Sequence, residues 1–402
     1  MTRRLVLVAC LALLPMAPPG AQEARYFREG RYLVHEITGV LRDQVPRVRV
    51  ETDLGSVSAV ATSAPDLRYR IRVRARGGDD AATRRLLDDM QVSAAVNGDR
   101  LLFLGRSLAP GAVRDLTVDF EIELPSRVAE FEVATGAGDV RGSNLPGRAE
   151  LQTRGGNITV DRLKGPLLAE TRGGNIEIGS ASGTARLITA GGSVRLESAG
   201  GEVVVQTSGG DVFIGRASAQ VRAESGGGNV TVEAAGGDVS AQTRGGSIGI
   251  GDVRGEVIAV TAGGSIRVAS ARGGVRCESG AGPIFLKVID GPIRAVTSAG
   301  NIQAEILPAG RTLFDSEIQT WSGDVLLALP ESPRVSIRAI VDNSQGRRIR
   351  SDFPLRIYRE AEDAGRPVEI AEGAIGGGGP LIKIRTLDGN IVIQKAKIAQ
   401  PQ

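Results

Sequence analysis

The chain has 402 residues and a formal charge of +3, so it is long enough for a large core. It contains 55 glycines but only 3% aromatic residues, which argues against an ordinary globular core and suggests that glycine serves a regular geometry. The charges are interspersed, without the basic block typical of nucleic-acid-binding proteins, and we expect no nucleic-acid partner.

The first residues have the layout of a secretory signal peptide. Arg3 and Arg4 precede an apolar run over residues 5–16, and small residues follow up to Ala21. We expect a signal peptide over residues 1–21 and an exported protein in the periplasm, at the cell surface or secreted. Residues 7–10 also fit a lipoprotein box, so lipidation at Cys10 stays open. No later stretch has the roughly 18 apolar residues that a membrane span needs.

An 18-residue repeat organises the middle of the chain. A Thr or Ser recurs at this spacing from Thr135 to Thr297, and a glycine follows three positions later in each copy. A unit this small cannot bury its own apolar side, so the copies must stack on one another. The corner glycines are Gly138, Gly156, Gly174, Gly192, Gly210, Gly228, Gly246, Gly264, Gly282 and Gly300.

Apolar and polar residues alternate within each unit, as is typical of strands, and the Gly-Gly pairs indicate corners with positive φ. Equivalent apolar positions form two ladders, one from Ala149 to Ile293 and one from Ile158 to Ile302. We expect the Thr and Ser hydroxyls to bond the backbone or each other, and the Asn, Asp or Ser after Gly-Gly to cap the turn. The prediction is an all-β protein, a parallel β-solenoid with 18-residue coils over residues 131–306.

The flanks depart from the repeat and are predicted to be irregular, strand-rich caps. The N-terminal cap covers residues 22–130, with degenerate coils, one short helix near residues 81–90 and a strand near residues 116–124. The C-terminal cap and last coil cover residues 307–396, and residues 397–402 form a tail. Trp321, the only tryptophan, is expected to pack within the C-terminal cap.

Three segments carry a resemblance to a known family: ETDLGSV at residues 51–57, the TRGGNI coils from Thr153, and the closing TLDGNI from Thr386. Together they resemble the bacterial exported "putative adhesin" domain family, related to auto-transporter-type adhesin heads. The resemblance covers about residues 48–394. It implies a solenoid of the right-handed β-helix type and defines no catalytic residues.

Residues suited to catalysis or metal binding are sparse. His35 is the only histidine, so a zinc cluster of histidines is excluded and a histidine-based triad is not expected. Cys277 occupies a repeat position otherwise held by Ala, Leu or Val, which predicts a buried small side chain. The Gly-Gly-Asn-Ile corners lack the acidic row of calcium-binding β-rolls. We expect no cofactor, no metal and no catalytic residues.

The leading hypothesis is a non-catalytic adhesin or envelope-associated scaffold whose partner is a surface glycan or an envelope protein. The alternative is a polysaccharide lyase or hydrolase, because parallel β-helices also carry such enzymes. Its site would use Asp238 and Glu256, equivalent positions one coil apart, with Arg276 and Arg294 nearby. Phe213 and Phe285 lie four coils apart, too sparse for a platform that stacks on sugar rings.

Overall fold

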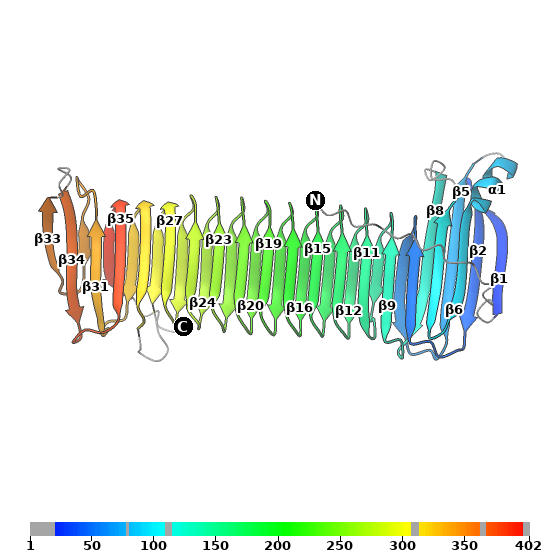
Figure 1. The fold of residues 1–402 in the computed structure, drawn as a ribbon, viewed down its shortest axis with the longest axis horizontal. Coiled ribbons are helices and arrows are strands. Elements are labelled where there is room, and N and C mark those ends of the chain that lie inside the picture. The colour runs from blue at the N-terminus through cyan, green and yellow to red at the C-terminus, as the bar shows by residue number, and fades with distance from the viewer. Residues whose placement is uncertain (1–20, 78–79, 109–114, 307–312, 362–366, 397–402) are drawn as a thin grey trace, which may run out of the picture. The chain divides into compact units, whose positions relative to one another are not determined.

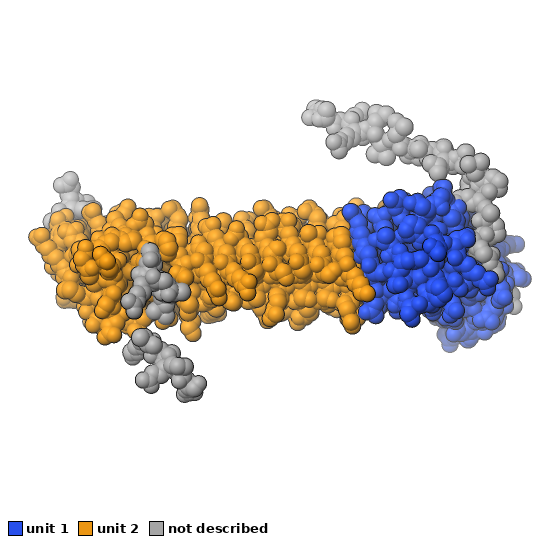
Figure 2. All heavy atoms as spheres, turned by 90° about the horizontal axis from the view of Figure 1, so that it is seen from below, with its two compact units in different colours: residues 1–153 blue, residues 154–402 orange. Residues whose placement is uncertain are grey.

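The computed structural model describes residues 21–77, 80–108, 115–306, 313–361 and 367–396. The predicted signal peptide up to residue 20, Cys10 and the tail at 397–402 lie outside these ranges. The chain forms two compact units, residues 1–153 and 154–402 (Figure 2), and each is described by itself. Within the described residues, no helix is both long enough and apolar enough to cross a membrane.

The described residues of unit 1 form strands and one short helix, which lies where helical spacing predicted it. Its elements are β1 (Ala21–Glu29), β2 (Tyr32–Leu41), β3 (Arg47–Thr52), β4 (Ser56–Thr62), β5 (Leu67–Arg76), α1 (Asp80–Asp88), β6 (Met90–Asn97), β7 (Arg100–Ser107), β8 (Leu116–Pro125), β9 (Glu130–Thr135), β10 (Val140–Ser143) and β11 (Arg148–Thr153).

The described part of unit 2 contains strands only, two for each 18-residue repeat, and Figure 1 shows them side by side. The repeat strands are β12 (Ile158–Leu163), β13 (Leu167–Thr171), β14 (Ile176–Ala181), β15 (Ala185–Thr189), β16 (Val194–Ala199), β17 (Val203–Thr207), β18 (Val212–Ala217), β19 (Val221–Ser225), β20 (Val230–Ala235), β21 (Val239–Thr243), β22 (Ile248–Val253), β23 (Val257–Thr261), β24 (Ile266–Ala271), β25 (Val275–Ser279), β26 (Ile284–Ile289), β27 (Ile293–Ala299) and β28 (Ile302–Ile306). The later strands are β29 (Ser316–Ser322), β30 (Val325–Leu329), β31 (Val335–Val341), β32 (Ile349–Ser351), β33 (Arg356–Ala361), β34 (Pro367–Ile375), β35 (Leu381–Asp388) and β36 (Ile391–Lys395).

Equivalent residues of successive coils pair in parallel, which confirms the predicted solenoid. Val203 pairs with Val221 in one sheet, and Val212 pairs with Val230 in the other. Both predicted ladders are buried, since no member is more than 3% exposed. Because the apolar rows of the two sheets face inward, the coils share one continuous core.

Hydrogen bonds at the corner link each coil to the one before it. The Thr207 hydroxyl donates to the Gly192 carbonyl oxygen at 2.8 Å and accepts from the Gly210 N–H at 3.2 Å. The polar residue after Gly-Gly acts between coils as well, because Asn175 Oδ1 accepts from the Ser193 N–H at 2.8 Å. The predicted backbone bonding of both polar columns is therefore confirmed.

The expected conformation of the corner glycines needs correction. Among the ten, only Gly138 (φ 136°) and Gly300 (φ 152°) have positive φ. Close backbone approach explains the glycine at seven of the others: Gly174, Gly192, Gly210, Gly228, Gly246, Gly264 and Gly282. A Cβ on Gly210 would lie 2.5 Å from the Gly192 carbonyl carbon and 2.6 Å from the Ser193 nitrogen. Stacking of the corners, more than their dihedral angles, excludes a side chain there.

The predicted degenerate coil in unit 1 is β3 with β4. It pairs in parallel with the later coil β9–β10, and Thr52 lies opposite Thr135. On its other side β3 pairs with β7 and β4 pairs with β8. The early coil β3–β4 therefore lies next to the coil β9–β10. Strands β7 and β8, which come between these two coils in the sequence, pair with the other side of β3–β4.

Unit 2 uses the same arrangement at its C-terminal end. Strand β35 pairs with β29 on one side and with β31 on the other, so the last coil lies between two coils that precede it in sequence. Thr386 lies opposite Thr320, and Thr320 lies opposite Thr297. Strands β34 and β33 extend the sheet beyond β31 in antiparallel pairing.

Candidate functional site

The outer face of unit 2 carries three adjoining hollows over β25, β27, β29, β35 and β31. Their volumes are about 450, 270 and 280 Å³. Glu317 and Lys383 line the first and second, while Gln319 and Arg385 line the second and third. Because neighbouring hollows share these residues, they form one open groove.

Strand pairing places the groove's side chains in rows across the sheet. Lys383 of β35 pairs with Glu317 on one side and with Arg338 on the other. Two residues farther along, Arg385 pairs with Gln319 and Ile340. Alternate residues of a strand share one face, so these side chains all project outward.

Most outward arginines on this sheet have a carboxylate partner. Arg276 bonds Glu278 at 2.8 Å, and Arg294 bonds Glu317 at 2.9 Å. Lys383 and Arg338 are both exposed, and no carboxylate of the described residues lies within 4.0 Å of either. Glu317 and Glu372 lie opposite Lys383 and Arg338 on the outer strands, so the row has two adjacent cations at its centre and a glutamate at each end.

Trp321 is 48% exposed, so the expectation that it packs within the cap is wrong. It is an outward residue of β29 and lines the third hollow with Gln319, Arg385 and Leu387. Ile318 and Thr320, at alternate positions before it in the strand, are buried and point inward, which leaves the indole on the solvent side. The groove thus combines cations with an exposed aromatic ring.

The residues considered for catalysis are only partly brought together. Glu256, Arg276 and Arg294 line the largest of the three hollows, whereas Asp238 does not. The Asp238 carboxylate accepts a hydrogen bond from the Glu256 N–H at 2.8 Å, which is a link between coils. Arg276 and Arg294 pair across neighbouring strands, and each is already bound to its own carboxylate.

The other side chains considered for catalysis, Cys277 and His35, both pack against neighbouring residues. Cys277 is fully buried between Ala259 and Ala295, as its repeat position predicts, and desolvation raises the pKa of its thiol to about 12. His35 stacks on Tyr26 with ring centroids 4.2 Å apart, and desolvation lowers its pKa. Within the described ranges, no group of three or more His, Cys, Asp or Glu side chains could hold a metal ion.

The two aromatic residues on the opposite sheet of unit 2 do not form an open platform. The Arg195 guanidinium lies over the Phe213 ring at 4.2 Å, and Arg267 lies over Phe285 at 5.0 Å. Each ring is half-buried and covered by a cation from the preceding coil.

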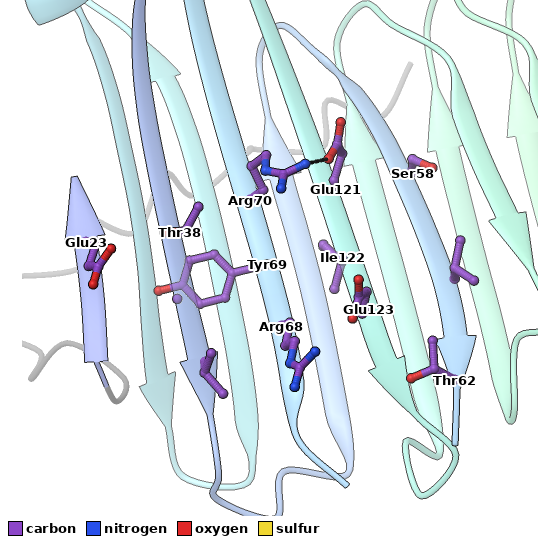
Figure 3. Close-up of a pocket in the computed structure, with 13 residues that line it drawn as sticks. Glu23, Thr38, Ser58, Thr62, Arg68, Tyr69, Arg70, Glu121, Ile122 and Glu123 are labelled. Carbon is purple, nitrogen blue, oxygen red and sulfur yellow. Dashed lines mark hydrogen bonds and ion pairs between the residues drawn. The ribbon is translucent and has the colours of Figure 1, made fainter. Parts of the chain in front are cut away.

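Unit 1 has a hollow of about 740 Å³ on the outer face of β1, β2, β5, β8 and β4 (Figure 3). Its charges nearly balance, with two arginines facing three glutamates, and Arg70 bonds Glu121 at 2.9 Å. The neighbouring Glu36 is buried and bonds Arg72 at 2.8 Å and Arg25 at 2.5 Å. This sheet face is largely neutralised by its own ion pairs.

Sequence reasoning did not single out Arg338, Lys383 or Arg385. Their alternation with apolar residues in β31 and β35 predicts outward positions but not neighbours. The three meet only because β35 inserts between β29 and β31, a pairing over long sequence separation.

Comparison with known proteins finds a likeness to solved structures. A scan of protein-family models and a search of the curated proteins both find no match. One similar structure is a "putative cell adhesion protein" from Clostridium sporogenes, 8% identical, with 90% of this chain and 99% of that chain covered and a TM-score of 0.21. Another is a "putative adhesin" from Bacteroides fragilis, 14% identical, with 90% and 97% covered and a TM-score of 0.22.

These descriptions agree with the resemblance drawn from the sequence. At such TM-scores the likeness carries no argument about the role of this chain, and the inferences below rest on its own residues.

Proposed function

We propose that this chain is an exported, non-catalytic binding protein, either an adhesin or an envelope-associated scaffold. The observation that supports it is the groove of unit 2, where basic and aromatic side chains face solvent on a sheet held by regular coil-to-coil bonds. A preorganised face of this kind binds with little cost in conformational entropy. The expected location is the periplasm, the cell surface or the medium, and the expected partner is a surface glycan or an envelope protein.

Binding by the chain from residue 22 onward tests this proposal. We expect saturable binding to at least one of three targets: intact bacterial cells, isolated envelope fractions or immobilised glycans. Absence of saturable binding to all three would contradict it. Mass spectrometry of the full-length chain expressed in a bacterial host tests export, since cleavage near Ala21 is expected.

A polysaccharide-cleaving enzyme is the second candidate, because Glu256, Arg276 and Arg294 share one hollow. It predicts turnover of an acidic or neutral polysaccharide that Asp238→Ala abolishes. Its weakness is that Asp238 and both arginines already have protein partners. Formation of new reducing ends or unsaturated products by the wild-type chain, lost in Asp238→Ala, would favour the enzyme over the binding protein.

A further inference from the structure

We propose that the groove over β29, β35 and β31 binds an acidic polysaccharide, with Trp321 against a sugar ring and Lys383 and Arg338 at its anionic groups. This inference rests on the proposed binding function and names its site and ligand class. The part of the groove that the proposal uses is its second and third hollows, lined by Gln319, Trp321, Arg338, Lys383, Arg385 and Leu387 together with the carboxylates Glu317 and Asp342.

Charge is the first reason. Lys383 and Arg338 are register partners on neighbouring strands, both exposed, with no carboxylate of the described chain within 4.0 Å. Glu317 and Glu372 lie opposite them on the two outer strands and offset part of the repulsion between the cations. Because neither glutamate forms an ion pair with them, an anion placed between Lys383 and Arg338 would be attracted to both. A guanidinium offers a bidentate fork to a carboxylate or sulfate, and the lysine adds a mobile point charge.

The aromatic side chain is the second reason. Trp321 opposes Leu387 in the sheet, and the two exposed apolar side chains form a flat patch beside Gln319 and Arg385. Sugar rings present apolar C–H faces and hydroxyl-bearing edges. The patch can receive the ring face, while the Gln319 amide can bond its hydroxyls; Arg385 is held by two hydrogen bonds to Asp342, at 2.7 and 3.1 Å.

The backbone pairing argues for a glycan over a peptide. Strands β29, β35 and β31 are each hydrogen-bonded on both sides, so the groove offers no free edge for a peptide to join as an added strand. Cations outnumber carboxylates in the second hollow, where Arg338, Lys383 and Arg385 face Glu317, whereas the first hollow has as many carboxylates as cations. The second hollow is therefore where an anionic group of the ligand would bind, and the exposed apolar patch beside it would receive a sugar ring.

Trp321 makes a direct test possible, since it is the only tryptophan in the chain and lies in the groove. The chain from residue 22 onward is titrated with polygalacturonate, heparin, neutral dextran and poly-L-glutamate while indole fluorescence is recorded. We expect a saturable change with at least one acidic polysaccharide, weakening as salt is raised because surface charges are screened. Polygalacturonate carries carboxylates only, whereas heparin carries sulfates in addition to carboxylates, so binding of heparin alone would show that sulfate is required. Dextran should produce little change.

Substitutions test whether binding requires the cations of the groove or any exposed cations of unit 2. Lys383→Gln with Arg338→Gln should weaken acidic polysaccharide binding about tenfold or more, with the indole still present as reporter. Arg186→Gln with Arg216→Gln, two exposed cations elsewhere in unit 2, is the matched control and should change affinity less than about twofold. By calorimetry, Trp321→Ala should lose about tenfold in affinity and Trp321→Phe should retain most of it.

Several outcomes would overturn the proposal. They are equal binding of dextran, tighter binding of poly-L-glutamate than of either acidic polysaccharide, and groove variants with wild-type affinity. If the chain binds cells or envelope fractions and the groove variants bind them equally well, the groove assignment fails while the binding function stands. If the wild-type chain binds none of the cells, fractions or polysaccharides, both fail.

Discussion

The Thr207 hydroxyl lies 2.8 Å from the carbonyl oxygen of Gly192, which belongs to the coil before it. The same hydroxyl accepts from the N–H of Gly210 in its own coil. One buried side chain thereby satisfies a backbone acceptor and a backbone donor of two stacked corners. The arrangement recurs along the Thr/Ser column, for example at Thr243 and Thr261.

Replacing Thr207 by Val keeps the shape and removes the hydroxyl. Two buried backbone groups then lose a partner, which we expect to cost about 1–3 kcal/mol. Chemical denaturation monitored by circular dichroism would measure it. Thr207→Ser is the control and should stay close to wild type, because serine fills this column at Ser225 and Ser279. Equal stability of the Val and Ser variants would show that the hydroxyl contributes nothing.

Gly210 and its neighbour Gly209 differ in the space that a side chain would have. A Cβ on Gly210 would meet the Gly192 carbonyl carbon at 2.5 Å, whereas on Gly209 the nearest atom would be the Gly191 oxygen at 3.5 Å. We expect Gly210→Ala to destabilise by about 1–3 kcal/mol and Gly209→Ala to have little effect. Thermal melts of the two variants make the comparison, and a larger loss for Gly209→Ala would contradict the close-approach explanation.

Val288 has φ 49° at a bulge in β26, an unfavourable conformation for a β-branched residue. Asparagine tolerates this region better, so Val288→Asn should stabilise by roughly 0.5–1 kcal/mol. The denaturation midpoint is the measurement. Lys287→Asn, at the preceding exposed position without positive φ, should bring no gain.

Cys277 should be inert in the folded protein. It is fully buried, and its thiol has a pKa of about 12, so little thiolate is present near neutral pH. A chromogenic thiol reagent at about pH 8 should label the chain from residue 22 onward only after denaturant is added. Rapid labelling of the native chain would show that the coil around Cys277 opens readily.

Glu36 should give unit 1 an acid-sensitive contribution to stability. Desolvation alone would raise its pKa, but hydrogen bonds and charges from Arg72 and Arg25 outweigh desolvation and lower it. A lowered folded-state pKa means that the contribution is present above the unfolded value and is lost as pH falls through the folded one.

Glu36→Gln tests this assignment. It should cost about 1 kcal/mol near neutral pH, a small figure because Arg25 is largely exposed and its ion pair is screened. Urea denaturation over a pH series should show the difference from wild type shrinking in acid. A difference that is constant across the series would contradict the role of the charge.

The 18-residue spacing was enough to predict the coils, their two buried ladders and the polar columns at the corner. These features follow from the sequence because neighbouring copies repeat the same short-range pattern of alternation and turns. Each copy is too small to bury its apolar side chains unless it stacks on its neighbours. The burial of Cys277 could be predicted for the same reason, since its column is otherwise Ala, Leu or Val. The repeat predicted where the corner glycines lie. It did not predict that most of them are required by close approach of stacked backbones and not by a positive φ.

Tertiary structure alone decided where the ends of the solenoid place their strands. Arg338 and Lys383 are neighbours because β35 inserts between β29 and β31. Trp321 is exposed because the alternation of side chains along β29 places it on the outer face of the sheet. Such pairings depend on the closure of long segments and on the fit of whole sheets, which local periodicity does not encode. At the corners, likewise, the distance between stacked backbones, and not the turn of one chain, explains why Gly210 has no side chain.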